Sequence, residues 1–347
     1  MGLSECNIQV GIFSFNTAST PWFEEHPNII CLQQAKSKQN NSILSKLNYL
    51  LHLPLLLWRI KQFKPDILHA HYASSYGFIA ALSFFKPLLV SVWGSDITQF
   101  PQKSWIHRSI IKFVFYRAKK ISGTSTLLKK EVARHTGKTC EVIPFGIDLN
   151  NFYSLEEKHH PSVFTIGVIK HLETIYNIDK VLDAFAILRK QHPHQKFVLK
   201  IIGEGSLEQS LKKQSEDLHL GNDVEFVGKV DHKLIPDYLH QLDVLVNVSD
   251  YESFGVSVAE AMACKIPVIV SPHDGFKDLV PNTAYAIVVP QITAFEIFKA
   301  LDDYYLHEEK RKQVTENSFD RIQTKFNWLQ NVKQMEKLYG EMNAIKN

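Results

Sequence analysis

Two glutamates, Glu252 and Glu260, are the residues of this sequence that are most clearly placed to take part in chemistry. They lie in a segment that reads SDYESFGVSVAEAMACKIPVIVS. A strand-like run leads into Phe254 and Gly255, and a helix-like run follows. The first amides of a helix have no partner within it, so they form a ready site for an anion. A carboxylate one turn further on, about 6 Å away, can accept hydrogen bonds from vicinal hydroxyls beside a phosphate. The pattern indicates such a site, although a capping residue and a surface charge would explain it equally well.

The elements around these glutamates follow a βα alternation, which predicts mainly parallel sheets. A turn-rich linker at 144–151 divides the alternation into two halves. We therefore expect two Rossmann-like α/β domains facing across a cleft, with ligands beyond the carboxyl ends of the strands. The domains are predicted over 1–148 and 149–326, followed by a helix in 327–347. Strands are predicted at 8–15, 66–70, 88–92, 120–123, 140–143, 164–169, 197–202, 224–227, 244–248 and 266–270. Helices are predicted at 47–62, 125–136, 178–191, 207–218, 234–242, 256–263 and 328–342.

Charge divides unevenly between the two halves. Residues 1–150 carry 17 Lys and Arg against 8 Asp and Glu, whereas the remaining residues carry 22 against 28. Much of the basic excess lies in 103–120, where apolar residues recur at helical spacing with basic residues between them. This segment is either a core helix with a solvated basic face or a surface for anionic lipid. Nucleic acid is a poor candidate for the partner of this basic segment, because no nucleic-acid-binding motif accompanies the charge.

Several other chemistries are disfavoured by the motifs. The turn Gly203-Glu204-Gly205 does not complete a dinucleotide fingerprint, because Glu208 stands at the third glycine position. No two aspartates are separated by a single residue, so the sequence lacks the D-x-D pattern that holds a divalent metal against a diphosphate. The four cysteines are scattered, which favours reduced thiols in a cytoplasmic protein over a zinc site or disulfides. We therefore expect no metal and no cofactor.

The Glu252…Glu260 segment resembles the E-x7-E signature of the retaining family 4 glycosyltransferases, also called group 1, which have the GT-B fold. Ala261-Met262-Ala263 and Pro267-Val268-Ile269 continue the likeness. Further segments that resemble the family are Val142–Asp148, Ile201–Gly205 and Val224–Val230. The resemblance covers nearly the whole chain. It implies a metal-independent transferase that moves a hexose-type sugar, with retention, from a nucleotide sugar to an acceptor.

The resemblance also implies roles for individual residues. Glu260 would bind the ribose hydroxyls and Glu252 the donor hexose, with a UDP-sugar as the expected donor. Lys170 would neutralise charge on the diphosphate leaving group. The donor-binding backbone is expected at Phe254, Gly255 and Val256 for the diphosphate, and at Gly228 and Val230 for the base. Acceptor-side candidates are His69, His71 and Asp96, and the acceptor would be a lipid-linked, polysaccharide or lipopolysaccharide precursor. The basic first half suits a peripheral position at the inner face of a membrane.

The sequence departs from the family pattern at three places. The family's second basic position falls on Ile175 or Tyr176, and Trp93 stands where a histidine is usual. Met1–Glu5 resembles the end of a first helix, which implies that the first βα unit is missing. These departures motivate a second hypothesis, a non-catalytic relative that binds nucleotide sugars in a binding or scaffolding role.

Overall fold

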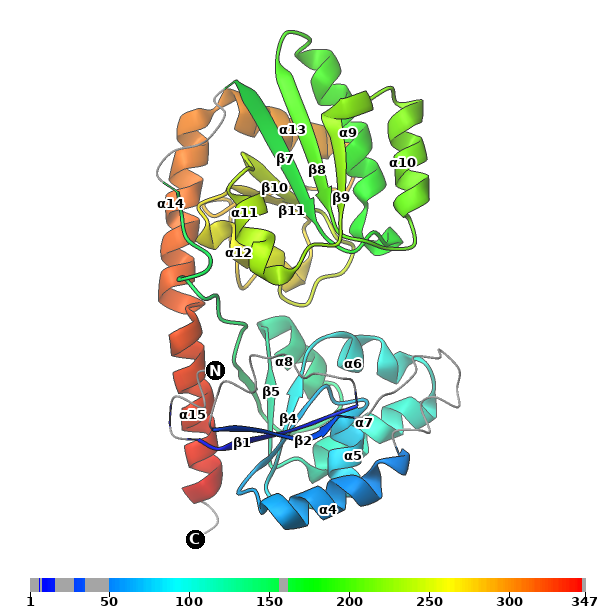
Figure 1. Ribbon diagram of the computed structural model, residues 1–347, viewed down its shortest axis with the longest axis vertical. Helices are drawn as coiled ribbons and strands as arrows, with labels where there is room; N and C mark the ends of the chain where they lie inside the picture. Colours follow the sequence, from blue (N-terminus) through cyan, green and yellow to red (C-terminus); the bar gives the residue numbers. More distant parts are fainter. Residues whose placement is uncertain (1–5, 7, 16–27, 35–49, 156–161, 345–347) are drawn as a thin grey trace. The chain divides into compact units, whose positions relative to one another are not determined.

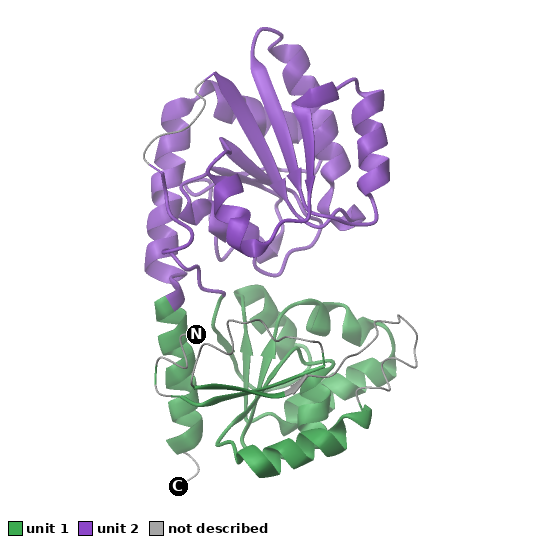
Figure 2. Ribbon diagram, viewed as in Figure 1, with its two compact units in different colours: residues 1–144, 329–347 green, residues 145–328 purple. Residues whose placement is uncertain are grey.

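The computed structural model describes residues 6, 8–15, 28–34, 50–155 and 162–344. They form two compact units, one of residues 1–144 and 329–347 and the other of residues 145–328 (Figure 2). We call these unit 1 and unit 2. Both are layered α/β structures with parallel strands, as the alternation of apolar runs and helical patterns predicts.

Unit 2 is built on a six-stranded parallel sheet in the order β12-β11-β10-β7-β8-β9 (Figure 1). Its strands are β7 (Val163–Ile169), β8 (Lys196–Ile202), β9 (Val224–Gly228), β10 (Val244–Asn247), β11 (Val268–Val270) and β12 (Ile287–Val288). The central strands are buried on both faces and read as continuous apolar runs, which is typical of a sheet covered by helices on both sides.

Two apolar cores flank this sheet. One contains buried residues of α9 (Ile178–Gln191) and α13 (Ala294–Leu306), such as Phe185 and Tyr304. The other contains residues of α11 (Ile235–Leu239) and α12 (Val256–Ala263) and the end of α14 (Glu308–Lys325). α10 (Glu208–Asp217) packs beside α9. The helix predicted at 178–191 and the helix predicted at 256–263 have these bounds in the structure.

Unit 1 contains a four-stranded parallel sheet and a separate two-stranded parallel sheet. The larger sheet runs β3 (Leu68–His71), β4 (Leu88–Val92), β5 (Lys120–Gly123) and β6 (Cys140–Val142). The smaller sheet pairs β1 (Val10–Ser14) with β2 (Ile29–Gln34), and the pattern did not predict β2. Among the described strands β1 pairs only with β2 and β3 only with β4, and the missing first βα unit stays a prediction.

The helices of unit 1 bury apolar faces against its strands. They are α4 (Leu53–Phe63), α5 (Tyr76–Leu82), α6 (Ser95–Thr98), α7 (Trp105–Arg117) and α8 (Thr126–Ala133). One face of the larger sheet packs against Ala80, Phe115 and Leu128, which come from three of these helices. On the other side, Leu338 and Met342 of the last helix, α15 (Trp328–Ala344), contact Leu89 of β4. The predicted return of the C-terminal helix to the first domain is therefore confirmed. No described helix combines the length and apolarity needed to cross a bilayer.

Candidate functional site

The order of strands in unit 2 brings two loops together. β7 lies between β8 and β10 in the sheet. The chain continues from β7 to β8 and β9 on one side of β7, and then crosses to form β10 on its other side. In open parallel sheets such a reversal opens a crevice at the carboxyl ends of the two strands, and ligands bind there. The loops at this point carry Lys170, just after β7, and Glu252, after β10.

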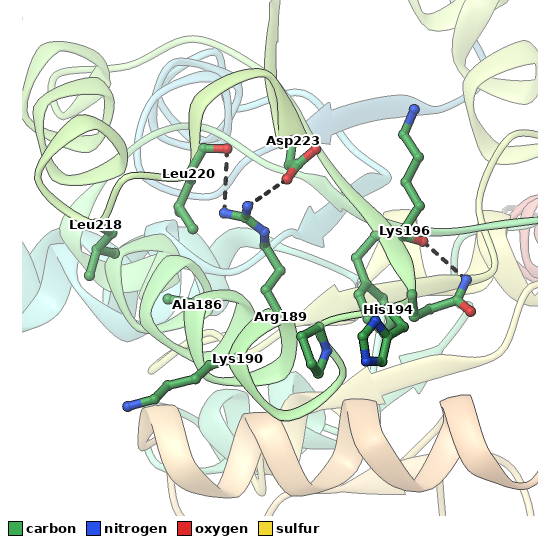
Figure 3. Close-up of a pocket in the computed structure, with 11 residues that line it drawn as sticks. Ala186, Arg189, Lys190, His194, Lys196, Leu218, Leu220 and Asp223 are labelled. Atoms are coloured by element: carbon green, nitrogen blue, oxygen red, sulfur yellow. Dashed lines mark hydrogen bonds and ion pairs between the residues drawn. The ribbon is translucent and has the colours of Figure 1, made fainter.

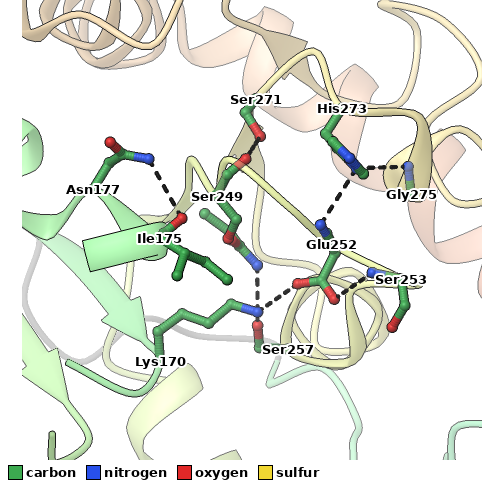
Figure 4. Close-up of polar contacts among 11 residues, drawn as sticks. Lys170, Ile175, Asn177, Ser249, Glu252, Ser253, Ser257, Ser271, His273 and Gly275 are labelled. Atoms are coloured by element: carbon green, nitrogen blue, oxygen red, sulfur yellow. Dashed lines mark hydrogen bonds and ion pairs between the residues drawn. The ribbon is translucent and has the colours of Figure 1, made fainter. Parts of the chain in front are cut away.

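Lys170 and Glu252 form an ion pair across the two loops, with Lys170 Nζ 2.6 Å from Glu252 Oε2 (Figure 4). Only 14% and 13% of the two side chains is exposed. The Lys170 ammonium also lies 5.0 Å from the centre of the Tyr176 ring, where a cation is attracted by the π face. Tyr176 is one of the two residues on which the second basic position was expected to fall, and its ring supplies no charge there.

Glu252 is held in its ionised form. Burial alone would raise the pKa of this carboxyl, but the Lys170 ammonium and the backbone amides of Ser253 and Phe254 outweigh burial and lower it. The Ser253 amide donates to Oε1 over 3.0 Å. The amide of Phe254, which we expected to face a diphosphate, therefore serves Glu252 in this structure.

Backbone contacts lock the same loops to each other. The amide of Asp250 donates to the carbonyl of Ile175 over 2.8 Å, and the Asn177 side chain donates to the carbonyl of Val248 over 3.0 Å. His273 Nδ1 accepts from the backbone amides of both Glu252 and Gly275 (Figure 4). Because two N–H groups point at Nδ1, the ring proton of a neutral His273 must lie on Nε2.

Two glycines permit this close packing. A Cβ on Gly203 would lie 1.9 Å from the carbonyl oxygen of Lys170, and the φ of Gly203 is +144°. A Cβ on Gly275 would lie 1.8 Å from the carbonyl oxygen of Glu252. The turn at 203–205 is therefore explained by the approach of a neighbouring loop, and Gly275 does the same for the loop of Glu252.

A short chain of buried polar groups supports the start of α12. The Ser249 hydroxyl donates to Asn247 Oδ1, and Asn247 Nδ2 donates to the Ser257 hydroxyl. The hydroxyl of Ser271 donates to the carbonyl of Ser249. Gly255 caps α12, which begins at Val256, so the first amides of that helix follow Glu252 closely in sequence, and Ser257 in its first turn lies near the Lys170–Glu252 pair (Figure 4). This arrangement has the character of an anion site at a helix start.

Glu260 lies one turn into α12 and is 4% exposed. Its Oε1 accepts from His232 Nε2 over 2.6 Å, and this hydrogen bond raises the pKa of His232 even though partial burial opposes it. The His232 ring lies 5.5 Å from the ring of Phe152. Sequence reasoning missed His232, because it stands 28 residues from Glu260 and no local pattern joins them.

The residues expected near a base lie on the neighbouring strand end. Gly228 ends β9, and its carbonyl accepts from the amide of Gly203 over 2.8 Å. Val230 is partly buried against the second core of unit 2. A separate cavity of about 660 Å³ is lined by Arg189, Lys196 and Asp223, among others (Figure 3). It lies where β8 begins, at the opposite end of the strands from Lys170 and Glu252.

In unit 1 the two predicted histidines lie at the end of β3. His69 contacts the Tyr339 hydroxyl through Nδ1 and the Ser91 hydroxyl through Nε2, both at 2.6 Å, and Ser91 contacts Ser122. Burial, with a smaller effect of His71, lowers the pKa of His69 well below its ordinary value, so His69 is neutral at pH 7. His69 therefore ties α15 to the sheet.

His71 and Asp96 differ in accessibility. His71 is exposed and lies between His69, 4.0 Å away, and Trp93, 5.5 Å away, measured between ring centres. The Asp96 carboxylate is fully buried and accepts from the amides of Ala73, Trp93 and Gly94, although burial raises its pKa. Asp96 thus holds the loops that follow β3 and β4, and its own oxygens face backbone.

Family models match both units of this chain. Residues 155–321 match the model of group 1 glycosyl transferases, and residues 2–125 match the glycosyl transferase 4-like model. The chain is a group 1 glycosyltransferase. Among curated relatives, this glycosyltransferase is 23% identical over 291 residues to the putative teichuronic acid biosynthesis glycosyltransferase TuaC of Bacillus subtilis, a match covering 79% of this chain and 70% of TuaC.

Solved structures show that this glycosyltransferase has the GT-B fold. The sucrose-phosphate synthase of Thermosynechococcus elongatus superposes with a TM-score of 0.82 at 21% identity, covering 99% of this chain and 91% of the synthase. The Anabaena protein HepE, in a complex with UDP-glucose, superposes with a TM-score of 0.76 at 19% identity, covering 98% of this chain and 95% of HepE. At these identities the likeness concerns the fold.

The His232–Glu260 hydrogen bond predicts a pH dependence. We expect His232 to titrate above its ordinary value near 6.5, and to return toward that value in the Glu260→Gln variant. Because the folded-state pKa is raised, the pair stabilises the fold fully below the unfolded pKa, and this contribution is lost as the pH rises through the folded pKa. NMR titration of the imidazole signals measures both values. Equal pKa values in wild type and variant would contradict the pairing.

The Gly275 contact predicts a destabilising substitution. In Gly275→Ala the new methyl group overlaps the Glu252 carbonyl, so we expect the free energy of unfolding to fall by about 1–3 kcal/mol. Gly340→Ala is the matched control, because Gly340 lies inside α15 and a Cβ added there would meet no atom within 4 Å. That control should raise the free energy of unfolding by about 0.5–1 kcal/mol. Urea denaturation checks both, and similar values for the two variants would contradict the packing argument.

Proposed function

We propose that this glycosyltransferase moves a hexose-type sugar from a nucleotide sugar, with a UDP-sugar as the first candidate, to a lipid-linked or polysaccharide precursor. The observation that carries the proposal is the juxtaposition of the Lys170–Glu252 pair with the start of α12 and with Glu260 one turn further. The group 1 match over 155–321 supports it, as does the UDP-glucose complex of HepE. The name of TuaC supports a polysaccharide acceptor.

In the proposed complex each donor group meets a chemically matched partner. The ribose hydroxyls donate to Glu260, whose carboxylate is buried at 4% exposure and already accepts from His232. The amides of Gly255 and Val256 donate to the diphosphate, which also gains from the helix dipole. Glu252 accepts from hydroxyls of the hexose, and the backbone near Gly228 and Val230 contacts the base.

The reaction breaks the bond between the anomeric carbon and the diphosphate oxygen, and the bonding electrons stay with the diphosphate. The acceptor hydroxyl forms the new bond and passes its proton to the departing diphosphate, and we propose that the configuration at the anomeric carbon is retained. Negative charge on the diphosphate grows as the bond breaks, so the Lys170 ammonium stabilises the transition state more than the bound donor. We propose that no metal takes part, because the sequence lacks a D-x-D motif.

Unit 1 supplies the proposed acceptor side. His71 is exposed at the carboxyl end of β3, held between His69 and Trp93, and is the first candidate to contact the acceptor. His69 and Asp96 are assigned supporting roles, because their polar atoms are engaged within unit 1. The basic charge of this half of the chain favours an acceptor held at an anionic membrane.

A donor screen followed by a turnover assay tests the proposal. Nucleotide sugars that bind should raise the melting temperature, and the best of them should be consumed when acceptor extracts are added. Binding without hydrolysis or transfer would favour the alternative, a non-catalytic nucleotide-sugar-binding protein, for which Tyr176 in place of a cation is the structural argument. If no nucleotide sugar binds, both hypotheses fail.

Glu260→Ala should weaken UDP binding, because the ribose loses a charged hydrogen-bond acceptor worth about 1.5–3 kcal/mol. Calorimetry should compare UDP with its 2′,3′-dideoxy analogue in both proteins. Wild type should prefer UDP, and the variant should bind the two ligands alike. Glu225→Ala, which breaks the Lys200–Glu225 pair between β8 and β9, is the control. A preference for UDP that persists in Glu260→Ala would remove Glu260 from the ribose site.

Lys170→Ala should lower kcat by about 10²- to 10³-fold while UDP affinity changes far less, because its charge acts mainly in the transition state. Removing one partner also leaves Glu252 largely buried and unpaired, so the melting temperature of Lys170→Ala is measured beside kcat to separate misfolding from lost chemistry. Lys200→Ala, which breaks an ion pair of the same length, is the matched control and should keep full activity.

The same assay tests metal independence, since turnover should persist in a chelator. Loss of activity that magnesium restores would contradict that part of the proposal. Equal losses of kcat and of UDP affinity in Lys170→Ala would limit Lys170 to a ground-state role.

A further inference from the structure

One face of α7 is exposed and has an unusual composition. Trp105, Arg108, Lys112 and Tyr116 recur at steps of three or four residues, so they share one side of the helix along about 17 Å. Trp105 and Tyr116 are each 76% exposed. The opposite side of α7 is buried in the core of unit 1 through Ile111, Val114 and Phe115. We call the exposed side the α7 face.

The α7 face ends at a basic cavity of about 420 Å³. The cavity is lined by Lys86, Pro87, Leu88, Tyr116, Arg117, Ala118, Lys119 and Lys138. Four of these residues are cationic, and Tyr116 belongs both to the cavity and to the α7 face. We call Lys86, Arg117, Lys119 and Lys138 the basic pocket. It lies where β4 begins and α7 ends, at the opposite end of the strand from His71 and Trp93.

The basic pocket is built by contacts as well as by charge. Lys138 donates to the backbone carbonyls of Tyr116 and Ala118 at the end of α7. The Arg117 guanidinium lies 4.5 Å from the ring centre of Phe84, which is 65% exposed. Burial and the positive charge of Arg117 lower the pKa of Lys138, as expected where cations lie close together.

The surrounding sequence offers few acids to neutralise these cations. Between residues 26 and 130, Asp66 and Asp96 are the only acidic residues, against fifteen Lys and Arg. Asp96 is fully buried and accepts from backbone amides, so it contributes nothing at the surface. The resulting excess of positive charge is complementary to a surface that carries many negative charges.

We propose that the α7 face docks on an anionic phospholipid bilayer and that the basic pocket receives a lipid phosphate. Exposed Trp and Tyr residues favour the boundary between headgroups and acyl chains, and Lys and Arg near it gain from the negative surface potential. The exposed side chains of Phe84, Trp105 and Ile106 suit a lipid boundary better than a nucleic acid or an acidic protein. The proposal rests on the membrane-held acceptor of the proposed function, and names the surface that meets the membrane.

Vesicle flotation tests the proposal with the full chain. Wild type should bind vesicles containing about one third phosphatidylglycerol, and should bind phosphatidylcholine vesicles weakly. Lys86→Glu/Lys119→Glu should weaken binding at least about 25-fold, since each basic residue contributes about fivefold. Lys190→Glu/Lys213→Glu places the same charge change on exposed residues of unit 2 and should bind like wild type. Equal losses in the two double variants, or no preference of wild type for anionic vesicles, would overturn the proposal.

A second pair of variants tests the aromatic contacts. At high salt, Trp105→Ser/Tyr116→Ser should bind anionic vesicles more weakly than wild type does, because charge attraction is screened there and apolar insertion remains. If this variant binds vesicles as tightly as wild type at every salt concentration, the α7 face does not insert. Binding of inorganic phosphate without vesicle binding would show a site for soluble phosphate and overturn the proposal.

UDP binding, which tests unit 2, is measured in parallel and should be unchanged in all these variants. Vesicle binding without UDP binding in wild type would leave the docking surface standing and count against the proposed function alone.

Discussion

The structure of the site depends on one buried ion pair, Lys170 with Glu252. Taking two charges out of water is costly unless each finds the other and their remaining hydrogen bonds are made. Here the backbone amide of Ser253 and the ring of Tyr176 complete the pair. Because neither loop can bury its charge alone, the loops after β7 and β10 must fold together. The loops can approach each other because Gly203 and Gly275 have no Cβ. A Cβ added at either position would overlap a carbonyl of the neighbouring loop.

The pair also constrains how a phosphate can be bound. An ammonium has three N–H donors, and one of them is directed at Glu252. A diphosphate at the start of α12 can accept a second N–H of the Lys170 ammonium while the first still donates to Glu252. Binding therefore adds an anion without leaving the Glu252 carboxylate unpaired. Tyr176 contributes polarisable surface where a second cation would contribute charge. In the proposed complex, stabilisation of the leaving group would come from Lys170 together with the first amides of α12, and the polar chain from Asn247 to Ser257 supports the start of that helix.

How much of this could be predicted from the sequence depends on how local the cause is. The helix at 256–263 and the strands β4 and β5 were predicted with their observed bounds, because apolar periodicity and the flanking Gly and Lys residues mark them. Glu252 and Glu260 were singled out from their places before and within a predicted helix, whereas their specific roles and that of Lys170 came from the family resemblance. The contacts His232–Glu260 and His69–Tyr339 join residues 28 and 270 positions apart, and no local pattern encodes such pairs. Asp96 looked like an acceptor contact, but its buried loop-holding role depends on amides from the loop after a different strand.

The two halves of the chain thus use positive potential in different ways. A site for one particular phosphate needs convergent donors with fixed directions, and unit 2 offers helix amides beside a single buried ammonium. A surface facing many phosphates gains from the number of its cations, and the α7 face with its basic pocket brings several cations together. In the proposed function, directed donors explain why the half that carries Lys170 and α12 needs no net positive charge. In the proposed function, attraction would depend on the direction of a few donors in unit 2 and on the number of charges in unit 1, and the charge asymmetry along the sequence is consistent with that division.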